Sequence, residues 1–140
     1  MMKEYKLSID DYQKLLKSIE LKDISLRNIT LKTDEEQFGK EYKLSIKPKA
    51  RHEIVDNAIY FYYQFKLEAK SPDKEKPGIR IIPEYKITYT KKSQTHIDPE
   101  FYEIFPEASL KFIIWPYFRE LVQNTISRMN LPPLVLPTIM

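Results

Sequence analysis

Residues 59–69 read Ile-Tyr-Phe-Tyr-Tyr-Gln-Phe-Lys-Leu-Glu-Ala and carry the strongest two-residue period of the chain. Every second residue from Ile59 to Ala69 is apolar, which is the pattern of a strand with one face on a core. Tyr60 and Tyr62 make the start of the opposite face aromatic as well. We therefore predict a strand here that is partly apolar on both sides.

A strand with one solvated face is predicted before it. Tyr42, Leu44 and Ile46 alternate with polar residues in the same period. Pro48 follows, and because proline has no backbone N–H it limits this strand or places it at an edge of the sheet.

The apolar residues that open the sheet region change phase. Ile24 and Leu26 occupy one parity, whereas Ile29 and Leu31 occupy the other. A strand accommodates this change only with a bulge, which we predict near Arg27 and Asn28.

A fourth strand is predicted after a turn at residues 71–78, which contain two prolines and four charged residues. Apolar residues recur in phase between Ile79 and Thr90. Pro83 lies inside this run and argues for an edge strand or a bulge.

Helices are predicted at both ends of the chain. Ser8 followed by Asp11 has the form of a capping box with Asp in place of Glu or Gln, and apolar residues then recur at helical spacing. Pro116 opens the second helix, which has an apolar stripe. This helix ends at Asn130, because Pro132 and Pro133 cannot continue it. Before it we expect an ordered loop rich in aromatic residues, in which Asp98 caps one helical turn.

The order of these elements indicates an α+β fold. We expect a four-stranded antiparallel sheet with a long C-terminal helix and a short extra N-terminal helix, in a single domain because the chain has 140 residues. The predicted parts are the extra helix at 9–18, a four-strand meander at 19–92, a crossover loop at 93–115, the long helix at 116–130 and a tail at 131–140.

Residue types that several kinds of chemistry require are missing. Gly39 and Gly78 are the only glycines, which excludes glycine-rich phosphate loops, and there is no cysteine for a disulfide or a thiolate site. His52 and His96 lie in polar, turn-like stretches without a second ligand at metal spacing. We predict no enzyme, no catalytic residue, no metal and no cofactor.

Charge and hydropathy exclude further classes. The net charge is +3, from 23 basic and 20 acidic residues that are interspersed, which is too mild a bias for a nucleic-acid signature. The apolar runs are too short to cross a bilayer, and together with the missing cysteine they indicate a cytoplasmic protein. An RNA-binding module is the weaker alternative, because Tyr60, Tyr62 and Tyr63 on one strand could stack bases.

The aromatic content points to a binding surface. One Trp, ten Tyr and seven Phe are more aromatic side chains than a small core hides easily. We expect some of them to form an exposed patch, which supports oligomerisation and peptide binding equally.

A resemblance to a known family is carried by residues 114–137, Ile-Trp-Pro-Tyr-Phe-Arg-Glu-Leu-Val-Gln-Asn-Thr-Ile-Ser-Arg-Met-Asn-Leu-Pro-Pro-Leu-Val-Leu-Pro. This stretch resembles the signature of the SecB chaperones, in which Pro-Tyr and an Arg-Glu pair open the long helix. The matching positions here are Pro116, Tyr117, Arg119 and Glu120. Residues 22–25, Lys-Asp-Ile-Ser, resemble the first-strand motif of that family, so the resemblance spans about residues 21–137.

The resemblance implies an ATP-independent holdase for unfolded or precursor polypeptides. It implies a homotetramer, a dimer of dimers, whose clients bind grooves lined by the second strand and the crossover loop. The corresponding groove residues are Tyr42, Leu44, Ile46, Phe101, Ile104, Phe105 and Leu110.

Three departures from the family bear on its partners. Export members are acidic and meet the ATPase SecA through the sheet face, where Asp23 and Glu84 match acidic positions but Arg27 does not. This chain is basic overall. Typical members also continue beyond the position of Met140 into a helix that covers the groove, so we expect this lid to be missing or replaced by the N-terminal helix. These departures favour the branch that guards antitoxins of toxin–antitoxin systems, or a general holdase.

Overall fold

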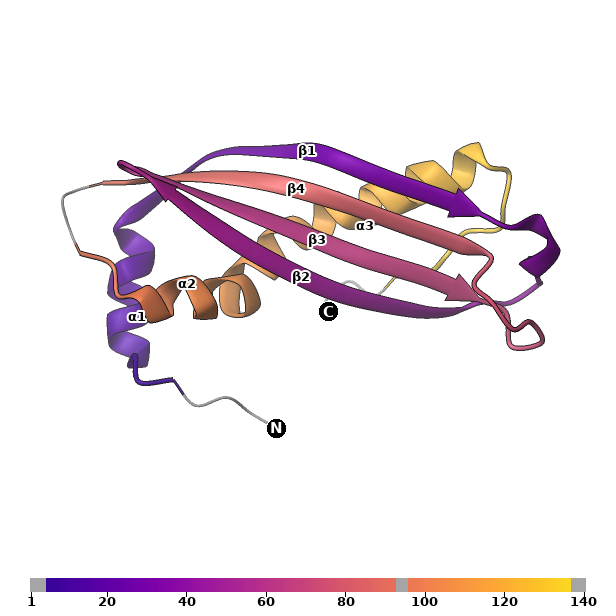
Figure 1. The fold of residues 1–140 in the computed structure, drawn as a ribbon, viewed down its shortest axis with the longest axis horizontal. Helices are drawn as coiled ribbons and strands as arrows, with labels where there is room; N and C mark the ends of the chain where they lie inside the picture. Colours follow the sequence, from indigo (N-terminus) through magenta and orange to yellow (C-terminus); the bar gives the residue numbers. More distant parts are fainter. Residues whose placement is uncertain (1–4, 93–95, 137–140) are drawn as a thin grey trace.

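The fold is a four-stranded antiparallel sheet with helices on one face (Figure 1). The computed structural model describes residues 5–92 and 96–136. Its elements in chain order are α1 (Ile9–Lys17), β1 (Ile19–Thr33), the 3-10 turn η1 (Glu35–Gln37), β2 (Lys43–Val55), β3 (Ala58–Lys70), β4 (Ile79–Lys91), α2 (Pro99–Phe105), the π-helical turn η2 (Pro106–Leu110) and α3 (Lys111–Arg128). In Figure 1, α3 runs behind the sheet, and α1 and α2 lie at one end of it. The predicted α+β class with both helices is confirmed.

The strand order is β1-β4-β3-β2, which corrects the predicted meander of all four strands. Only β2, β3 and β4 follow one another as hairpins, and β1 pairs with β4 in a Greek-key arrangement. Two consecutive strands therefore form the two opposite edges of the sheet. Local sequence patterns could not reveal this, because they do not report which strand is the neighbour of which.

Two bulges in β1 bring its apolar residues to one face. The pairing with β4 shifts between Leu21 and Asp23 and again between Leu26 and Asn28. The second shift confirms the predicted bulge, and the first was not predicted. Because each bulge adds one residue, residues of both parities end up opposite the buried positions of β4 and share the face that the helices cover.

The two prolines within strands have different surroundings. Pro48 lies in β2, an edge strand as predicted, but the strand continues past it to Val55. Pro83 lies in β4, which is an inner strand, so the edge alternative is wrong there. Pro83 pairs with Ile29 just beyond the second bulge of β1, where the ladder is already irregular.

The helical layer begins earlier than the sequence predicted. The predicted loop at 93–115 is largely helical from Pro99 onward, and α3 begins at Lys111, not at Pro116. Asp98 caps α2, as expected, by accepting a hydrogen bond from the Glu100 backbone N–H at 2.9 Å. Pro116 lies inside α3 and has no N–H, so the carbonyl of Phe112, four residues earlier, lacks its helical donor. Phe112 is exposed, so water can supply that donor. Residues 93–95 and 137–140 lie outside the described part of the chain.

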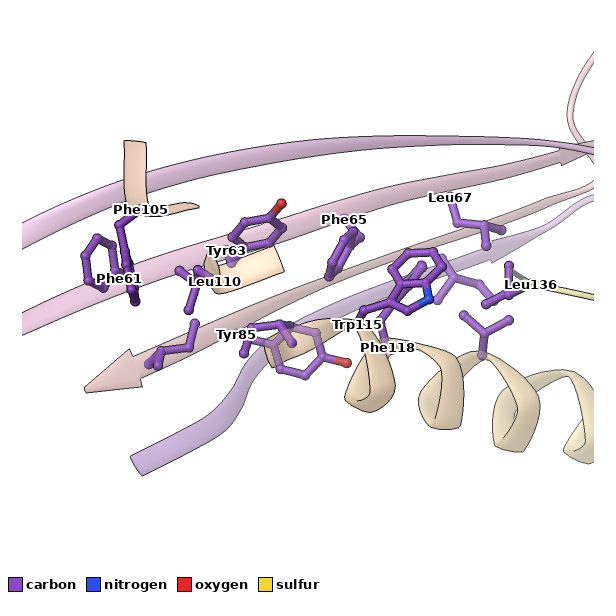
Figure 2. Close-up of a cluster of buried hydrophobic side chains, with 14 of the residues drawn as sticks. Phe61, Tyr63, Phe65, Leu67, Tyr85, Phe105, Leu110, Trp115, Phe118 and Leu136 are labelled. Carbon is purple, nitrogen blue, oxygen red and sulfur yellow. The ribbon is translucent and has the colours of Figure 1, made fainter. Parts of the chain in front are cut away.

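Aromatic rings join the helical layer to the sheet (Figure 2). Phe118 of α3 stacks on Phe65 of β3 with ring centroids 4.4 Å apart, and Trp115 contacts the same ring edge-on at 5.6 Å. Phe105 of α2 packs on Phe61 at 4.9 Å. All these rings are buried, so α2 and α3 are held over the two inner strands.

The N-terminal helix is capped as its sequence predicts. The hydroxyl of Ser8 accepts a hydrogen bond from the Asp11 backbone N–H at 3.1 Å, and α1 ends at Lys17. Tyr12 joins α1 to the helical layer, because its hydroxyl is 2.8 Å from the Ser109 hydroxyl and its ring lies 5.3 Å from that of Phe101.

Candidate functional site

A hollow lies between the second half of β2 and the segment formed by α2 and η2, and we call it the β2 groove. Its volume is about 280 Å³. The lining residues are Pro48, Lys49, Ala50, His52, Tyr63, Tyr102, Glu103, Pro106 and Glu107. Its walls combine rings and prolines with the charged side chains of Lys49, Glu103 and Glu107, and the groove lies beside the open edge of the sheet.

The wall of the β2 groove is held by a ring pair. His52 of β2 stacks on Tyr102 of α2 with centroids 4.7 Å apart and an interplanar angle of 12°. His52 is exposed and lies in a strand, which corrects the turn predicted around it. Tyr102 is buried, so His52 forms the exposed rim and Tyr102 the buried wall.

The floor of the β2 groove is a neutral phenol. Burial, with a further contribution from the nearby carboxylate of Glu107, raises the pKa of Tyr63 to about 12. Burial also raises the pKa of Tyr102. Both hydroxyl groups therefore stay protonated near neutral pH, and Glu103 and Glu107 give the rim an acidic character.

The structure does not bring together the groove residues that the resemblance implied. Leu44 and Ile46 lie opposite Ala69 and Leu67, in the first half of β2, whereas α2 packs over the other half. Leu44 lines a separate hollow with Pro72 and Pro77. The hydroxyl of Tyr42, in the same region, accepts a hydrogen bond from the Gly39 backbone N–H.

Three of the four residues implied on the crossover segment are core residues. Phe101, Phe105 and Leu110 are buried under the helical layer, and only Ile104 is partly exposed. In this conformation a client could reach these side chains only after α2 moves. Their role as client contacts stays a prediction.

Sequence reasoning missed Pro48, Ala50 and His52 as groove residues. They continue the parity of Leu44 and Ile46 along β2 and lie opposite the buried positions of β3. Extending the alternation past Pro48 would have found them. A proline often ends a strand, but an edge strand tolerates it, so the alternation continues through Pro48.

A second hollow lies between β1 and α3, and we call it the β1 groove. Its lining residues are Ile24, Leu26, Tyr85, Tyr117, Glu120, Leu121 and Asn124. A row of exposed apolar side chains extends it along β1, with Leu21, Leu26, Ile29 and Leu31 each 40–45% exposed. The bulges of β1 align this row, so the groove continues as an apolar strip along an open edge.

A buried hydroxyl lies in the floor of the β1 groove. The Tyr85 hydroxyl has no hydrogen-bond partner among the described residues. Burial, with a smaller effect of Glu120, raises the pKa of Tyr85 to about 12, so it remains a donor. A buried donor without an acceptor costs free energy, which a molecule docked over the groove would recover.

The residues of the C-terminal motif serve both faces of α3. Tyr117 and Glu120 line the β1 groove, and Pro116 is exposed. Arg119 lies on the other side, in a hollow of about 600 Å³ beneath residues 130–136. Its Nε is buried and has no partner in the described part of the chain.

Other classes of site find no support in the described residues. Within the described ranges, residues 5–92 and 96–136, no group of three or more His, Cys, Asp or Glu side chains could hold a metal ion. No described helix is long and apolar enough to cross a membrane.

Comparison with known proteins places the architecture. No family model and no curated protein matches the sequence. Among solved structures, the SecB-like chaperone Rv1957 of Mycobacterium tuberculosis superposes with a TM-score of 0.77 and 16% sequence identity, over 91% of this chain and 95% of that chain. The chain has the SecB-like chaperone fold. The resemblance that the C-terminal motif carried is thereby confirmed at the level of the fold.

Two of the similar solved structures differ in how closely they match this chain. Rv1957 was solved in complex with a ChAD peptide from the Rv1956 HigA1 antitoxin. A protein of unknown function from Streptococcus agalactiae matches with a TM-score of 0.47 and 7% identity, over 85% of this chain and 96% of that chain. This second match is too distant to carry an argument.

The outer face of this SecB-like sheet, opposite the helices, carries the residues that the resemblance assigned to SecA. Asp23 lies opposite Thr88, and Glu84 lies opposite Asn28 and Gln64, on the face without helices. Tyr60 and Tyr62 share this face, whereas Tyr63 is buried on the other, so the three tyrosines do not form one stacking platform.

Proposed function

We propose that this chain is an ATP-independent chaperone that holds unfolded polypeptide, with the β2 groove as its client site. The observation that carries the proposal is the groove itself, a hollow with ring-lined walls directly beside the open edge of β2. An extended client can pair with the edge through its backbone and insert alternate side chains into the groove. Backbone pairing is independent of sequence, which suits a chaperone with many clients.

The surroundings of the groove support capture without a chemical step. Pro48, Pro106 and the stacked rings of His52 and Tyr102 offer apolar surface, and burial of such surface is worth about 25 cal/mol per Å². Glu107 at the rim favours clients with basic residues next to apolar ones. The missing cysteine suits a reducing cytoplasm, where we propose that it works.

The β1 groove is proposed as the contact between copies of the chain. Its apolar strip lies along a 15-residue edge strand, and long apolar edges are usually paired or covered. Two copies of β1 can pair antiparallel about a twofold axis, which places the same strip on both sides of the contact. This pairing leaves the β2 groove free, in agreement with a dimer that builds a tetramer.

Delay of aggregation tests the proposed function. The purified chain is mixed at equal molarity with a chemically denatured model protein, without nucleotide, and light scattering is followed after dilution of the denaturant. We expect the scattering to rise later and to a lower level than with an equal mass of serum albumin. Equal scattering in the two samples would refute the holdase.

A dedicated client is the second candidate function. The observation in its favour is that the structural relative Rv1957 was solved with an antitoxin peptide. Co-purification from the source cell with identification by mass spectrometry separates the alternatives. One small partner supports an antitoxin, whereas many precursors together with SecA support export.

A further inference from the structure

The outer face of the sheet contains a buried ring that no helix covers. In Figure 1 the strands face the viewer, α3 lies behind them, and α1 and α2 lie at one end. Tyr62 points to this open face, because it lies opposite Arg51 and Lys86 in the register, yet it is only 5% exposed. Other side chains of the same face must therefore cover it.

Two guanidinium groups provide this cover. The Arg51 guanidinium carbon lies 3.8 Å from the centre of the Tyr62 ring, and that of Arg27 lies 5.2 Å from it. Arg27 starts from the second bulge of β1, so its side chain reaches across β4 to meet β3. The neighbouring ring of Tyr60 is approached by Lys86 at 4.5 Å. Cation–π contacts thus hold three cations over two rings at the centre of the sheet.

Neither arginine has a carboxylate partner among residues 5–92 and 96–136. The salt bridges of this face, Lys66 with Glu68 and Arg80 with Glu68, lie farther along the strands. Arg27 and Arg51 are both exposed. Their planar donor groups are therefore positioned by the ring while remaining free for an acceptor from outside.

The charge around the pair is mainly positive. The register places further basic side chains on the same face, and the exposed ones are Lys32, Lys43, Lys47, Lys49 and Lys66. Asp23, Glu53 and Glu84 are the acidic residues nearest to the centre. The face complements an anionic partner, and a second copy of the same face would be repelled.

We propose that the outer face binds an acidic polypeptide segment, whose carboxylates are held by Arg27 and Arg51. A guanidinium binds a carboxylate through two parallel hydrogen bonds, and a guanidinium already fixed on a ring loses less freedom on binding. Arg27 and Arg51 line neither groove. The proposed site therefore goes beyond client holding and provides a docking place for a second, acidic partner.

The geometry favours an acidic polypeptide over single-stranded nucleic acid. Bases would need free rings to stack on, but Tyr62 is buried under the guanidinium groups and Tyr60 lies beneath Lys86. Glu53, Glu84 and Asp23 also interrupt the positive charge, which opposes a continuous phosphate backbone. Separate carboxylates on a flexible chain can avoid them.

Fluorescence anisotropy with a labelled 20-residue peptide of alternating Glu and Ser tests the proposal. The full chain is titrated in parallel with R27Q/R51Q, with R27K/R51K and with the control K14Q/K17Q. The control removes two exposed cations of α1 and has the same net charge as R27Q/R51Q. Circular dichroism and the aggregation assay of each variant show that fold and client holding are intact.

We expect the Kd to rise at least tenfold in R27Q/R51Q, several-fold in R27K/R51K and less than twofold in the control. R27K/R51K keeps the charge, so a weaker affinity of this variant for the peptide would show that the planar donor groups of arginine are required. An equal loss in the control, or no binding by the wild-type chain at 50 mM salt, would overturn the proposal. Tighter binding of a single-stranded oligonucleotide of equal charge would overturn it too and assign the face to nucleic acid.

Discussion

His52 of β2 stacks face to face on Tyr102 of α2, with ring centroids 4.7 Å apart. This contact joins the exposed edge of the sheet to the first helix of the helical layer. It also forms the boundary of the β2 groove, where the proposed client binds. The pair therefore places His52, a strand residue outside any recognised motif, at the proposed client site.

Replacement of His52 by alanine should weaken client binding. The His52 ring is exposed, so we expect the fold to tolerate its loss. An aromatic contact between this ring and a client is worth about 0.5–1.5 kcal/mol, or about two- to twelvefold in Kd. Binding of a labelled, permanently unfolded model protein measures the effect. The control is His96→Ala, which removes an exposed histidine outside the groove. Equal affinities of the two variants would show that the β2 groove is not the client site.

Replacement of Leu26 by glutamate should break the contact between copies. The carboxylate would enter the apolar strip along β1, which associates only if it stays dry. Light scattering after size exclusion should show a smaller assembly than for the wild-type chain. Ile9→Glu serves as control because Ile9 is 77% exposed at the start of α1, away from β1. An unchanged mass for Leu26→Glu would place the contact elsewhere.

Tyr85→Phe and Tyr12→Phe should change stability in opposite directions. Tyr85 carries a buried hydroxyl without a partner, so its removal should raise the free energy of unfolding by about 1 kcal/mol. The Tyr12 hydroxyl is bonded to that of Ser109, so its removal should lower the free energy by about 1 kcal/mol. Urea unfolding of dilute protein measures both. A loss in both variants would mean that water or a second copy satisfies Tyr85.

Alkaline pH should destabilise the fold between about pH 10 and pH 12. Burial raises the pKa of Tyr63, of Tyr85 and of Tyr89 to about 12, whereas their pKa is 10.0 in the unfolded chain. The unfolded state therefore loses its protons first, so this contribution is fully present below pH 10 and is lost as the pH rises through the folded pKa. Urea midpoints at pH 8, 10 and 11.5 should fall, and less steeply for Tyr85→Phe. Parallel curves for the two proteins would contradict the assignment.

Phe118→Ala should be among the most damaging single changes. The ring is fully buried and stacks on Phe65 between α3 and the sheet, so its loss should cost about 3–5 kcal/mol. Phe112→Ala is the matched control, since Phe112 lies on the same helix but is 46% exposed. Thermal unfolding should separate the two variants clearly. Similar midpoints would mean that α3 is not held by this stack.

Local patterns predicted the elements well where one principle dominated. The two-residue period of residues 59–69 predicted β3, and Ser8 with Asp11 predicted the start of α1. They failed where packing overrode a local signal. Pro116 predicts a helix start, but α3 begins five residues earlier and runs through it, whereas Pro48 lies in an edge strand, as one of its two predicted alternatives required.

The sequence by itself determined the secondary structure period, the α+β class, and the lack of cysteine and of a glycine-rich phosphate loop. It also carried the C-terminal motif that predicted the SecB-like fold. Only the tertiary structure decided that β1 lies beside β4, that both bulges of β1 align one apolar strip, and that Arg27 reaches Tyr62 across an intervening strand. The physical reason is that strand order and register depend on the contacts of residues far apart in the chain. The periodicity of one strand contains no information about its neighbour.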